Sequence, residues 1–150
     1  MANSQAIATS FKVQMLNGIH AFGTTVVRGG TTADTFKAAL YLASASRGAG
    51  DTVYNSTGEA SGPGYSAGGV AVVWTAPSST GTTAFTTLNA TITYTTVTLT
   101  TAFDAVLIYN STQGDKAVSV HTFGSQTVTA GTFTLTMPTN DATTGLLRFA

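Results

Sequence analysis

Three features predict an all-β fold for this chain of 150 residues. Threonine, whose β-branched side chain suits a pleated surface with one wet face, recurs along the whole chain. Eight or nine short segments with strand patterns follow residue 24 and are separated by turn signals. No helical segments alternate with them, which excludes doubly wound α/β folds. We therefore expect a single-domain β-sandwich or jelly-roll-like fold over residues 23–150, with a barrel as the alternative, preceded by an N-terminal arm and short helix over residues 1–22.

The first residues predict an arm and then a helix. Residues 1–9 are small and polar, which favours a flexible arm. Over residues 10–17 apolar side chains recur about every four positions, with Ser10 suited to the N-cap and Gly18 to the stop. The alternative is that these apolar side chains close one end of a barrel.

The first half of the β domain predicts two strands around a long loop. Residues 35–43 alternate between apolar and other side chains, which predicts a strand. Residues 47–69 are rich in Gly, Ser and Asn and predict a loop; a loop of this length usually has a function or packs as an ordered excursion. Residues 70–75 are mostly apolar and predict a strand, ended by Pro77 and a turn over residues 78–81.

The clearest strand signal is at residues 91–101. Its apolar residues change parity across Thr95 and Thr96, so we expect a bulge or sharp bend at this pair. Residues 105–109 are almost continuously apolar, as in a strand buried on both faces.

The remaining segments complete the β pattern. A turn at residues 110–115 precedes predicted strands at 117–123 and 132–137, and residues 146–149 add a last strand. No fixed-period repeat is present, which excludes solenoids and propellers.

Composition excludes several classes of function. Charged residues make up 8% of the chain, against about 25% in a typical domain. The net charge is zero, which argues against binding to nucleic acid or to a membrane surface. Cysteine is absent, so thiolate catalysis, disulfides and Cys-ligated zinc are excluded. Because little charge opposes self-association, we expect a homo-oligomer, as a trimer or a dimer.

The sequence shows no secretory signal and no membrane span. No basic segment followed by an apolar run opens the chain, and no apolar run approaches the ~20 residues that cross a bilayer. We therefore expect synthesis in the host cytoplasm and no association with membranes.

One motif resembles an enzyme site. Residues 64–68 match G-x-S-x-G, the pattern that exposes a nucleophilic serine, here Ser66. Asp104 or Asp115 and then His121 follow in the order of a catalytic triad. The context argues against it, because a loop precedes Ser66 and a strand rather than a helix follows. We expect a glycine turn here, no catalytic residues and no enzyme activity.

No metal or cofactor site is expected either. The acidic residues are scattered singly, and His20 has no carboxylate near it in sequence. His121, in the segment VSVHTF, is expected on the surface or hydrogen-bonded within a strand. Tyrosine and tryptophan could form a platform for sugars, but they more often fill a β core, which is the interpretation we favour.

Several segments, taken in order, resemble a family of proteins. TFKAALY (35–41), the Tyr54…TGEASGPGYSAGGV run (54–70), VLIYN (106–110), Phe123-Gly124, Gly131-Thr132-Phe133 and Met137-Pro138 together resemble a recurrent small virion protein of tailed bacteriophages. The resemblance covers the chain from about residue 10 to its end. It implies a structural component of the particle, outside the shell, with no cofactor and no catalytic residues.

The expected function is that of a capsid cement or decoration protein, which binds and stabilises the outer surface of a phage capsid. Its partner would be the major capsid protein, and its location the capsid surface of the virion. The alternatives are a tail-associated adaptor or glycan-binding adhesin module and, as a third class, a small esterase at Ser66. We further expect residues 1–22 to contribute to anchoring, and residues 47–69 to face the shell or a sister subunit.

Overall fold

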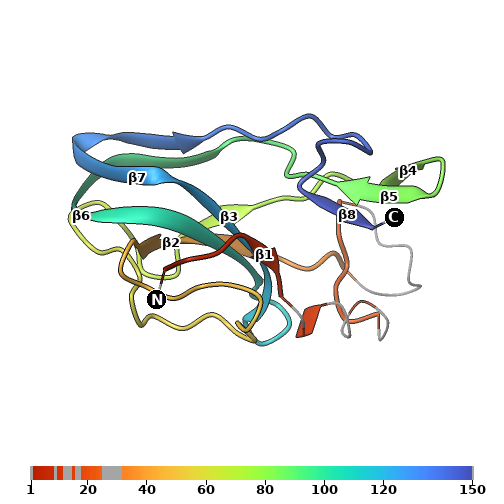
Figure 1. Ribbon diagram of the computed structural model, residues 1–150, viewed down its shortest axis with the longest axis horizontal. Coiled ribbons are helices and arrows are strands. Elements are labelled where there is room, and N and C mark those ends of the chain that lie inside the picture. Colours follow the sequence, from red (N-terminus) through yellow and green to blue (C-terminus); the bar gives the residue numbers. More distant parts are fainter. Residues whose placement is uncertain (1, 9, 12–14, 16–17, 25–31, 150) are drawn as a thin grey trace.

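The computed structural model describes residues 2–8, 10–11, 15, 18–24 and 32–149 of the chain. These residues form two antiparallel sheets compatible with a β-sandwich, so the predicted all-β class is confirmed. The larger sheet has the strand order β1-β7-β6-β2-β3, and the smaller has the order β4-β5-β8 and lies at one end of the molecule (Figure 1). The strands are β1 (Ala6–Ile7), β2 (Phe36–Leu42), β3 (Val70–Val72), β4 (Ser78–Thr80), β5 (Thr83–Thr86), β6 (Ile92–Asn110), β7 (Lys116–Leu135) and β8 (Leu147–Phe149).

Most predicted strands are present, but they join differently. The strands predicted at 35–43, 70–75 and 146–149 are β2, β3 and β8, with slightly different ends. The segments predicted as four separate strands in the second half of the chain form only two, β6 and β7, and the residues of the predicted strand 105–109 are all buried, as expected. The predicted turn over residues 78–81 contains β4 instead, because an exposed strand of Ser and Thr carries no apolar alternation.

β6 and β7 form a long hairpin that folds back on itself. Tyr94 lies near the start of β6, whereas Ile108, near its end, is the register partner of Ala38 in β2. A straight strand would separate Tyr94 from Ile108 by about 46 Å, at about 3.3 Å per residue. Yet the Tyr94 hydroxyl donates a hydrogen bond of 2.8 Å to the Ala38 carbonyl. The first half of β6 and the end of β7 therefore form a second layer over β2 (Figure 1).

Two threonine pairs accompany this bend. Thr95 and Thr96 are exposed, Thr96 has a φ of 54°, and the register between β6 and β7 shifts across the pair. This confirms the bulge or bend predicted there. Thr100 and Thr101 are exposed too, and the register shifts again across them. The first pair changes the parity of the buried residues, which pass from Ile92 and Tyr94 to Val97 and Leu99. The second pair leaves the parity unchanged, since Phe103 is the next buried residue, but it exposes Thr101 at a position where the alternation predicts burial.

Aromatic side chains from distant segments fill the core. Phe103 and Phe133 meet edge to face between the two layers of the hairpin, with ring centroids 4.9 Å apart. A second group joins the N-terminal segment to the rest, where Phe22 stacks on Phe36 at 5.1 Å and meets Trp74 edge-on at 5.0 Å. Aromatic pairs of this kind stabilise a fold by more than their buried area alone provides. These contacts therefore join the hairpin, β2 and the N-terminal segment in one core.

The loop predicted at residues 47–69 is present and is an ordered excursion packed on both layers. The Pro63 carbonyl accepts a 2.8 Å hydrogen bond from the Thr98 amide of β6. At its other end, Gly69 (φ 72°) lies so close to β2 that an added Cβ would be 1.7 Å from the Ala38 carbonyl oxygen. The loop therefore closes one side of the sandwich and needs glycine where it touches β2.

The N-terminal segment differs from the expected arm. The described residues 2–8 are held against the sheet, because Ala6 and Ile7 pair with β7. The Asn3 amide nitrogen donates to the Leu42 carbonyl at 3.0 Å, and the Asn3 amide oxygen accepts from the Arg47 amide at 2.9 Å. The expectation of a flexible arm is therefore wrong for residues 2–8, since a small polar side chain here satisfies backbone groups of another segment.

Of the helix predicted over residues 10–17, the described residues Ser10, Phe11 and Met15 are helical. The structure describes only residues 10, 11 and 15 of that segment, and the rest of it lies outside the described residues. Phe11 is fully buried beside His20 and Phe22, so this apolar residue does contribute to the core.

Candidate functional site

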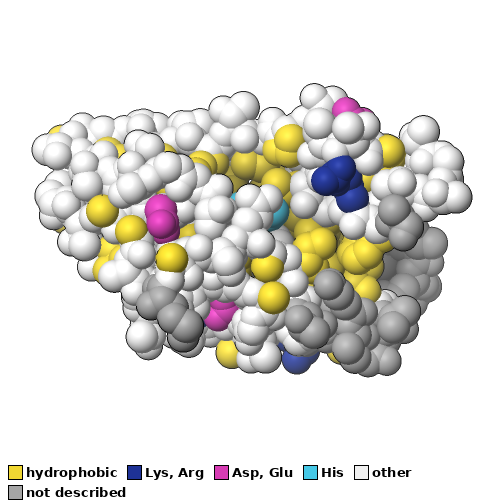
Figure 2. Space-filling model, viewed as in Figure 1, with side chains coloured by type: hydrophobic (Ala, Val, Ile, Leu, Met, Phe, Trp, Pro, Cys, Tyr) yellow, Lys and Arg dark blue, Asp and Glu magenta, His cyan; other side chains and the backbone are white. Residues whose placement is uncertain are grey.

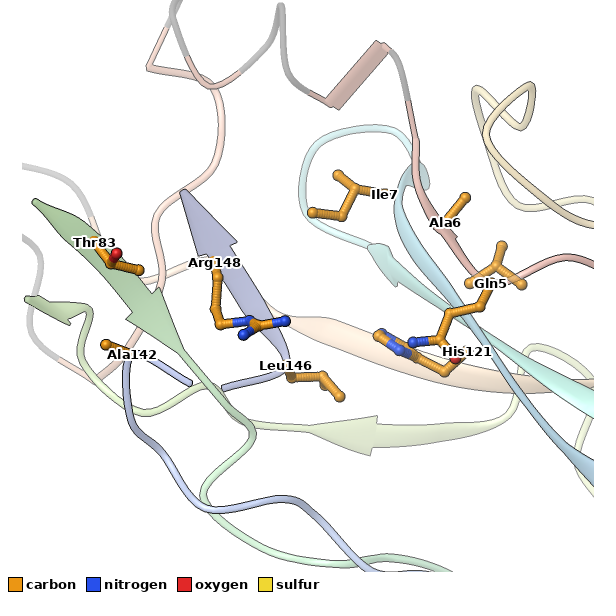
Figure 3. Close-up of a pocket in the computed structure, with 9 residues that line it drawn as sticks. Gln5, Ala6, Ile7, Thr83, His121, Ala142, Leu146 and Arg148 are labelled. Carbon is orange, nitrogen blue, oxygen red and sulfur yellow. The ribbon is translucent and has the colours of Figure 1, made fainter. Parts of the chain in front are cut away.

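A cleft of about 450 Å³ separates the edge of the larger sheet from the smaller sheet. In Figure 3 the Arg148 side chain extends from β8 toward the middle of the cleft, while Gln5 and His121 lie on the opposite side. Figure 2 shows a hollow with a hydrophobic floor between a histidine and a basic side chain. The cleft thus combines polar and basic walls with an apolar floor.

An apolar recess of about 180 Å³ adjoins the cleft and shares His121 and Leu146 with it. It lies between the two layers of the folded hairpin and the segment that follows β7. Its other lining residues are Ile92, Val106, Ile108, Thr122, Phe123, Leu135, Thr136, Met137 and Pro138. The cleft and the recess together suit a ligand that carries an apolar group next to a polar or anionic group.

His121 stands where the cleft meets the recess. Burial lowers the pKa of its imidazole to about 4, so the ring is neutral at neutral pH. Its Nε2 lies 2.9 Å from the hydroxyl oxygen of Ser119. The sequence expectation of a histidine hydrogen-bonded within a strand is therefore confirmed.

Ser119 and His121 have the separation of a nucleophile and its base, but not the surroundings. Ser119 is fully buried, so its hydroxyl is closed to a substrate. Among the described residues no carboxylate bonds to the imidazole, and a ring with so low a pKa is a weak base. Sequence reasoning did not single out Ser119, although its i, i+2 spacing from His121 on a strand places both on one face.

The predicted glycine turn at Ser66 is present. Ser66 is exposed, and its carbonyl accepts a 2.9 Å hydrogen bond from the Gly69 amide. Within the described chain no hydrogen bond links Ser66 to His121, and the carboxylate of Asp104 accepts from Asn3 instead. The structure therefore does not bring the residues of the possible triad into contact.

The most extensively bonded carboxylate is Glu59, the single glutamate of the sequence. It is largely buried, and its Oε1 accepts hydrogen bonds from the Tyr65 hydroxyl (2.8 Å) and the Gly68 amide (2.7 Å). Its Oε2 accepts one from the Tyr54 hydroxyl (2.7 Å). Buried charge is tolerated only where such partners satisfy it, so Glu59 holds the middle of the loop together. Sequence reasoning missed this role, because the partners are identified only by the fold.

The tyrosines around Glu59 remain hydrogen-bond donors. Burial raises the pKa of Tyr65 far above its ordinary value and that of Tyr109 to about 12. The Tyr109 hydroxyl donates to the Gly68 carbonyl at 2.8 Å, and the Tyr65 hydroxyl accepts from the Leu40 amide at 2.9 Å. These phenols link the loop to β2 and β6 and stay protonated at physiological pH.

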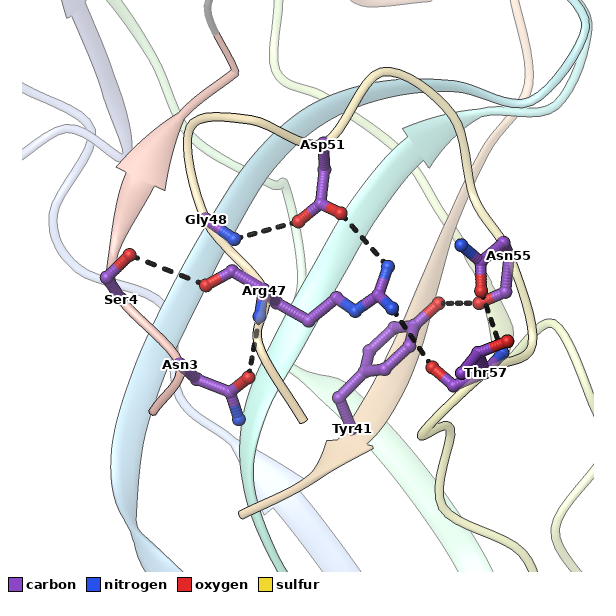
Figure 4. Close-up of polar contacts among 8 residues, drawn as sticks. All are labelled: Asn3, Ser4, Tyr41, Arg47, Gly48, Asp51, Asn55 and Thr57. Carbon is purple, nitrogen blue, oxygen red and sulfur yellow. Dashed lines mark hydrogen bonds and ion pairs between the residues drawn. The ribbon is translucent and has the colours of Figure 1, made fainter. Parts of the chain in front are cut away.

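Arg47 organises the start of the same loop (Figure 4). Its guanidinium forms a salt bridge of 3.0 Å with Asp51 and donates to the Thr57 carbonyl at 3.0 Å. It also lies 4.6 Å over the ring of Tyr41, a cation–π contact. Together with the Asn3 contact to the Arg47 amide, these bonds attach the loop to the N-terminal segment.

The other sites considered in the sequence are not assembled in the described part of the chain. No group of three His, Asp or Glu side chains there is placed to hold a metal ion. No helix formed by these residues has the length and hydrophobicity to cross a membrane. Trp74, Tyr94 and Tyr109 are almost fully buried, so they belong to the core, as favoured, and not to a platform for sugars.

Comparison of the chain with protein-family models, with curated proteins and with solved structures found no match.

Proposed function

We propose that the protein is a virion structural protein that binds and stabilises the outer surface of a phage capsid, as a cement or decoration protein. The observation that carries the proposal is the distribution of charge. Residues 60–103 and 117–140 contain no Asp, Glu, Lys or Arg, and they include all of β3, β4 and β5 and most of β7. Cores of protein interfaces are depleted of charge in the same way.

Exposed hydroxyl groups give this surface its polarity. The second half of β7, residues 124–135, has no buried residue and contains four threonines. Most of the face in Figure 2 carries neither charged nor hydrophobic side chains. Such a surface stays hydrated in the free protein. Its desolvation on binding costs little free energy, because hydroxyls exchange water for hydrogen bonds to a partner without the desolvation cost of charges.

The well-bonded loop also favours a structural role. Glu59 and Arg47 hold residues 47–69 in one conformation through side-chain bonds to the backbone and to tyrosines. A loop ordered before binding loses little conformational entropy when a partner covers it. This loop is the part of the molecule that we propose for contact with the shell or a sister subunit.

The proposal is tested by the copy number of the protein in purified phage particles, measured by quantitative mass spectrometry against the major capsid protein. We expect a ratio near one, or a simple fraction of it. A handful of copies per particle would instead favour the tail-associated adaptor or glycan-binding adhesin. Absence from the particles would reject a virion role altogether.

A second measurement tests the nature of the contact. Purified protein is added back to particles that lack it, and occupancy is measured as salt rises from about 0.05 to about 0.5 M. A contact made by uncharged surface should change little, because screening acts on charges. Occupancy that collapses with salt would contradict the charge-free contact, although not the location on the particle.

A further inference from the structure

We propose that two copies of this protein form a two-fold dimer by pairing the free edge of β7, residues 124–135, antiparallel to itself. This stretch is called the β7 edge below. The inference concerns the isolated protein, so it can fail or succeed independently of the proposed role on a capsid.

The β7 edge is an unpaired strand edge. On one side β7 pairs with β6 along its whole length. On the other side, β1 covers only Ser119 and Val120, with one more bond from the Ala8 amide to the Val118 carbonyl. From residue 121 onward no strand of the described chain pairs with this side, and in Figure 1 this half of β7 forms the outer margin of the upper layer. An edge of this kind offers amide and carbonyl groups to another strand.

Other strand edges in the described chain are short or covered. β1, β3, β4 and β8 have two or three residues each. The first half of β6 is covered by the loop, where Pro63 bonds to Thr98 and an added Cβ on Gly64 would lie 2.1 Å from the Thr96 carbonyl oxygen. Among the strands of the described chain, the β7 edge is therefore a long strand edge that no other segment covers.

The β7 edge lacks most of the side chains that usually prevent pairing. Soluble proteins protect edges with Lys, with proline or with inward-pointing charges. Residues 124–135 contain none of these. β-Bulges also protect edges, and β7 has extra residues around Ala130 (φ 45°) and between Thr122 and Gln126. The β7 edge is therefore regular only in the short stretches on either side of Ala130, and the pairing that we propose uses those stretches.

Charge and symmetry favour a second copy of this chain as the partner that pairs with the β7 edge. A partner strand with charged residues would bury them against a surface that has no charge to pair with them. A second β7 edge brings none, and it places threonine opposite threonine or other uncharged residues, a favourable cross-strand arrangement. Antiparallel pairing of two identical strands is closed by a two-fold axis, so assembly stops at the dimer.

The oligomeric state tests the inference directly. Sedimentation equilibrium of the full chain should show a dimer. In the double variant Thr127→Lys/Thr129→Lys each strand brings two positive charges to the paired edge, and we expect the dissociation constant to rise at least about tenfold. The matched control is Thr100→Lys, an equally exposed threonine on β6 outside the β7 edge, which should remain dimeric. Circular dichroism and thermal unfolding check that each variant is folded.

Cross-linking locates the axis without depending on the lysine variants. The chain has no cysteine, so single cysteines can be introduced at exposed positions of the β7 edge: Ser125, Thr127, Thr129, Thr132 and Thr134. In an antiparallel pair, the distance between equivalent residues grows by about 7 Å for each step from the axis, beyond the reach of a disulfide within two residues. We expect cross-linking to peak at one position and vanish on both sides of it.

Three results would overturn the inference. They are a wild-type protein that is monomeric at about 100 μM, a trimer or larger assembly, and a dimer that survives the double lysine variant with no position-dependent cross-linking. Equal loss of dimer in Thr100→Lys would also reject the β7 edge as the specific surface.

Discussion

Glu59 shows how a single side chain holds a long loop. Its two oxygens have different tasks, because Oε1 accepts from Tyr65 and Gly68 whereas Oε2 accepts only from Tyr54. The Tyr65 hydroxyl must donate to Glu59, since it already accepts from the Leu40 amide. The Tyr54 hydroxyl has no such constraint among its described bonds and can also accept.

This asymmetry predicts that two substitutions of Glu59 by side chains of similar size lower the free energy of unfolding by different amounts. In Glu59→Gln the amide oxygen can replace Oε1 and the amide nitrogen can donate to Tyr54, so we expect a loss of only about 1–2 kcal/mol in the free energy of unfolding. In Glu59→Met all three donors lose their acceptor, and the expected loss is about 3–5 kcal/mol. Urea unfolding of both variants measures the difference. Equal losses would mean that the negative charge, and not the hydrogen-bond pattern, stabilises the loop.

His121 predicts a pH dependence of stability. Burial lowers the pKa of its imidazole from 6.5 to about 4 in the folded protein. Between these values the unfolded chain binds a proton that the folded chain does not, so the free energy of unfolding falls as the pH is lowered from about 6.5 toward 4, by at most about 3.5 kcal/mol.

Urea unfolding at pH 7, 6 and 5 measures this effect. The variant His121→Gln is the control, because any loss of stability that it still shows over this pH range comes from other groups, such as carboxylates. We expect the stability of the wild type to decline over this range more steeply than that of the variant. Parallel curves would show that His121 is protonated equally well in both states.

Among the elements, the folded hairpin decides the architecture. The change of parity at Thr95 and Thr96 is visible in the sequence and correctly predicts a bend. The second shift, at Thr100 and Thr101, falls where the pattern suggests a gap between two strands. A bulge and a turn interrupt alternation in the same way, and only the continuous pairing with β7 shows that β6 continues through both.

The strain at this bend leads to a prediction. Thr96 is a β-branched residue with a φ of 54°, a conformation that costs about 1–2 kcal/mol for an L-residue. Its side chain is exposed, so Thr96→Gly should raise the free energy of unfolding by about 0.5–1 kcal/mol after the entropy of glycine is deducted. The control Thr95→Gly, at an exposed neighbour with ordinary φ, should lower it. A loss of stability in Thr96→Gly would show that the threonine side chain itself supports the bend.

At the scale of the whole molecule, segments far apart in the chain form both the core and the cleft. The cleft takes Gln5 from the N-terminal segment, Thr83 from β5, His121 from β7 and Arg148 from β8. Only His121 was singled out in the sequence, as part of a possible triad, and no local pattern marks the other three as part of a site. The same holds for Asn3, which is polar and lies in a segment expected to be free, yet bonds to the backbone of Leu42 and Arg47.

Local properties of the sequence by themselves determined the all-β class, β2, β3 and β8, the buried character of residues 105–109, the bend at Thr95 and Thr96, and the scarcity of charge. Each of these depends on alternation, β-branching or composition, which act over a few residues. Only the tertiary structure decided that the hairpin folds back, that Glu59 meets three donors and that one edge of β7 stays open. Those features depend on which distant segments pair and pack together, and hydrogen-bond partners and neighbours across a sheet are not encoded in any short stretch of chain.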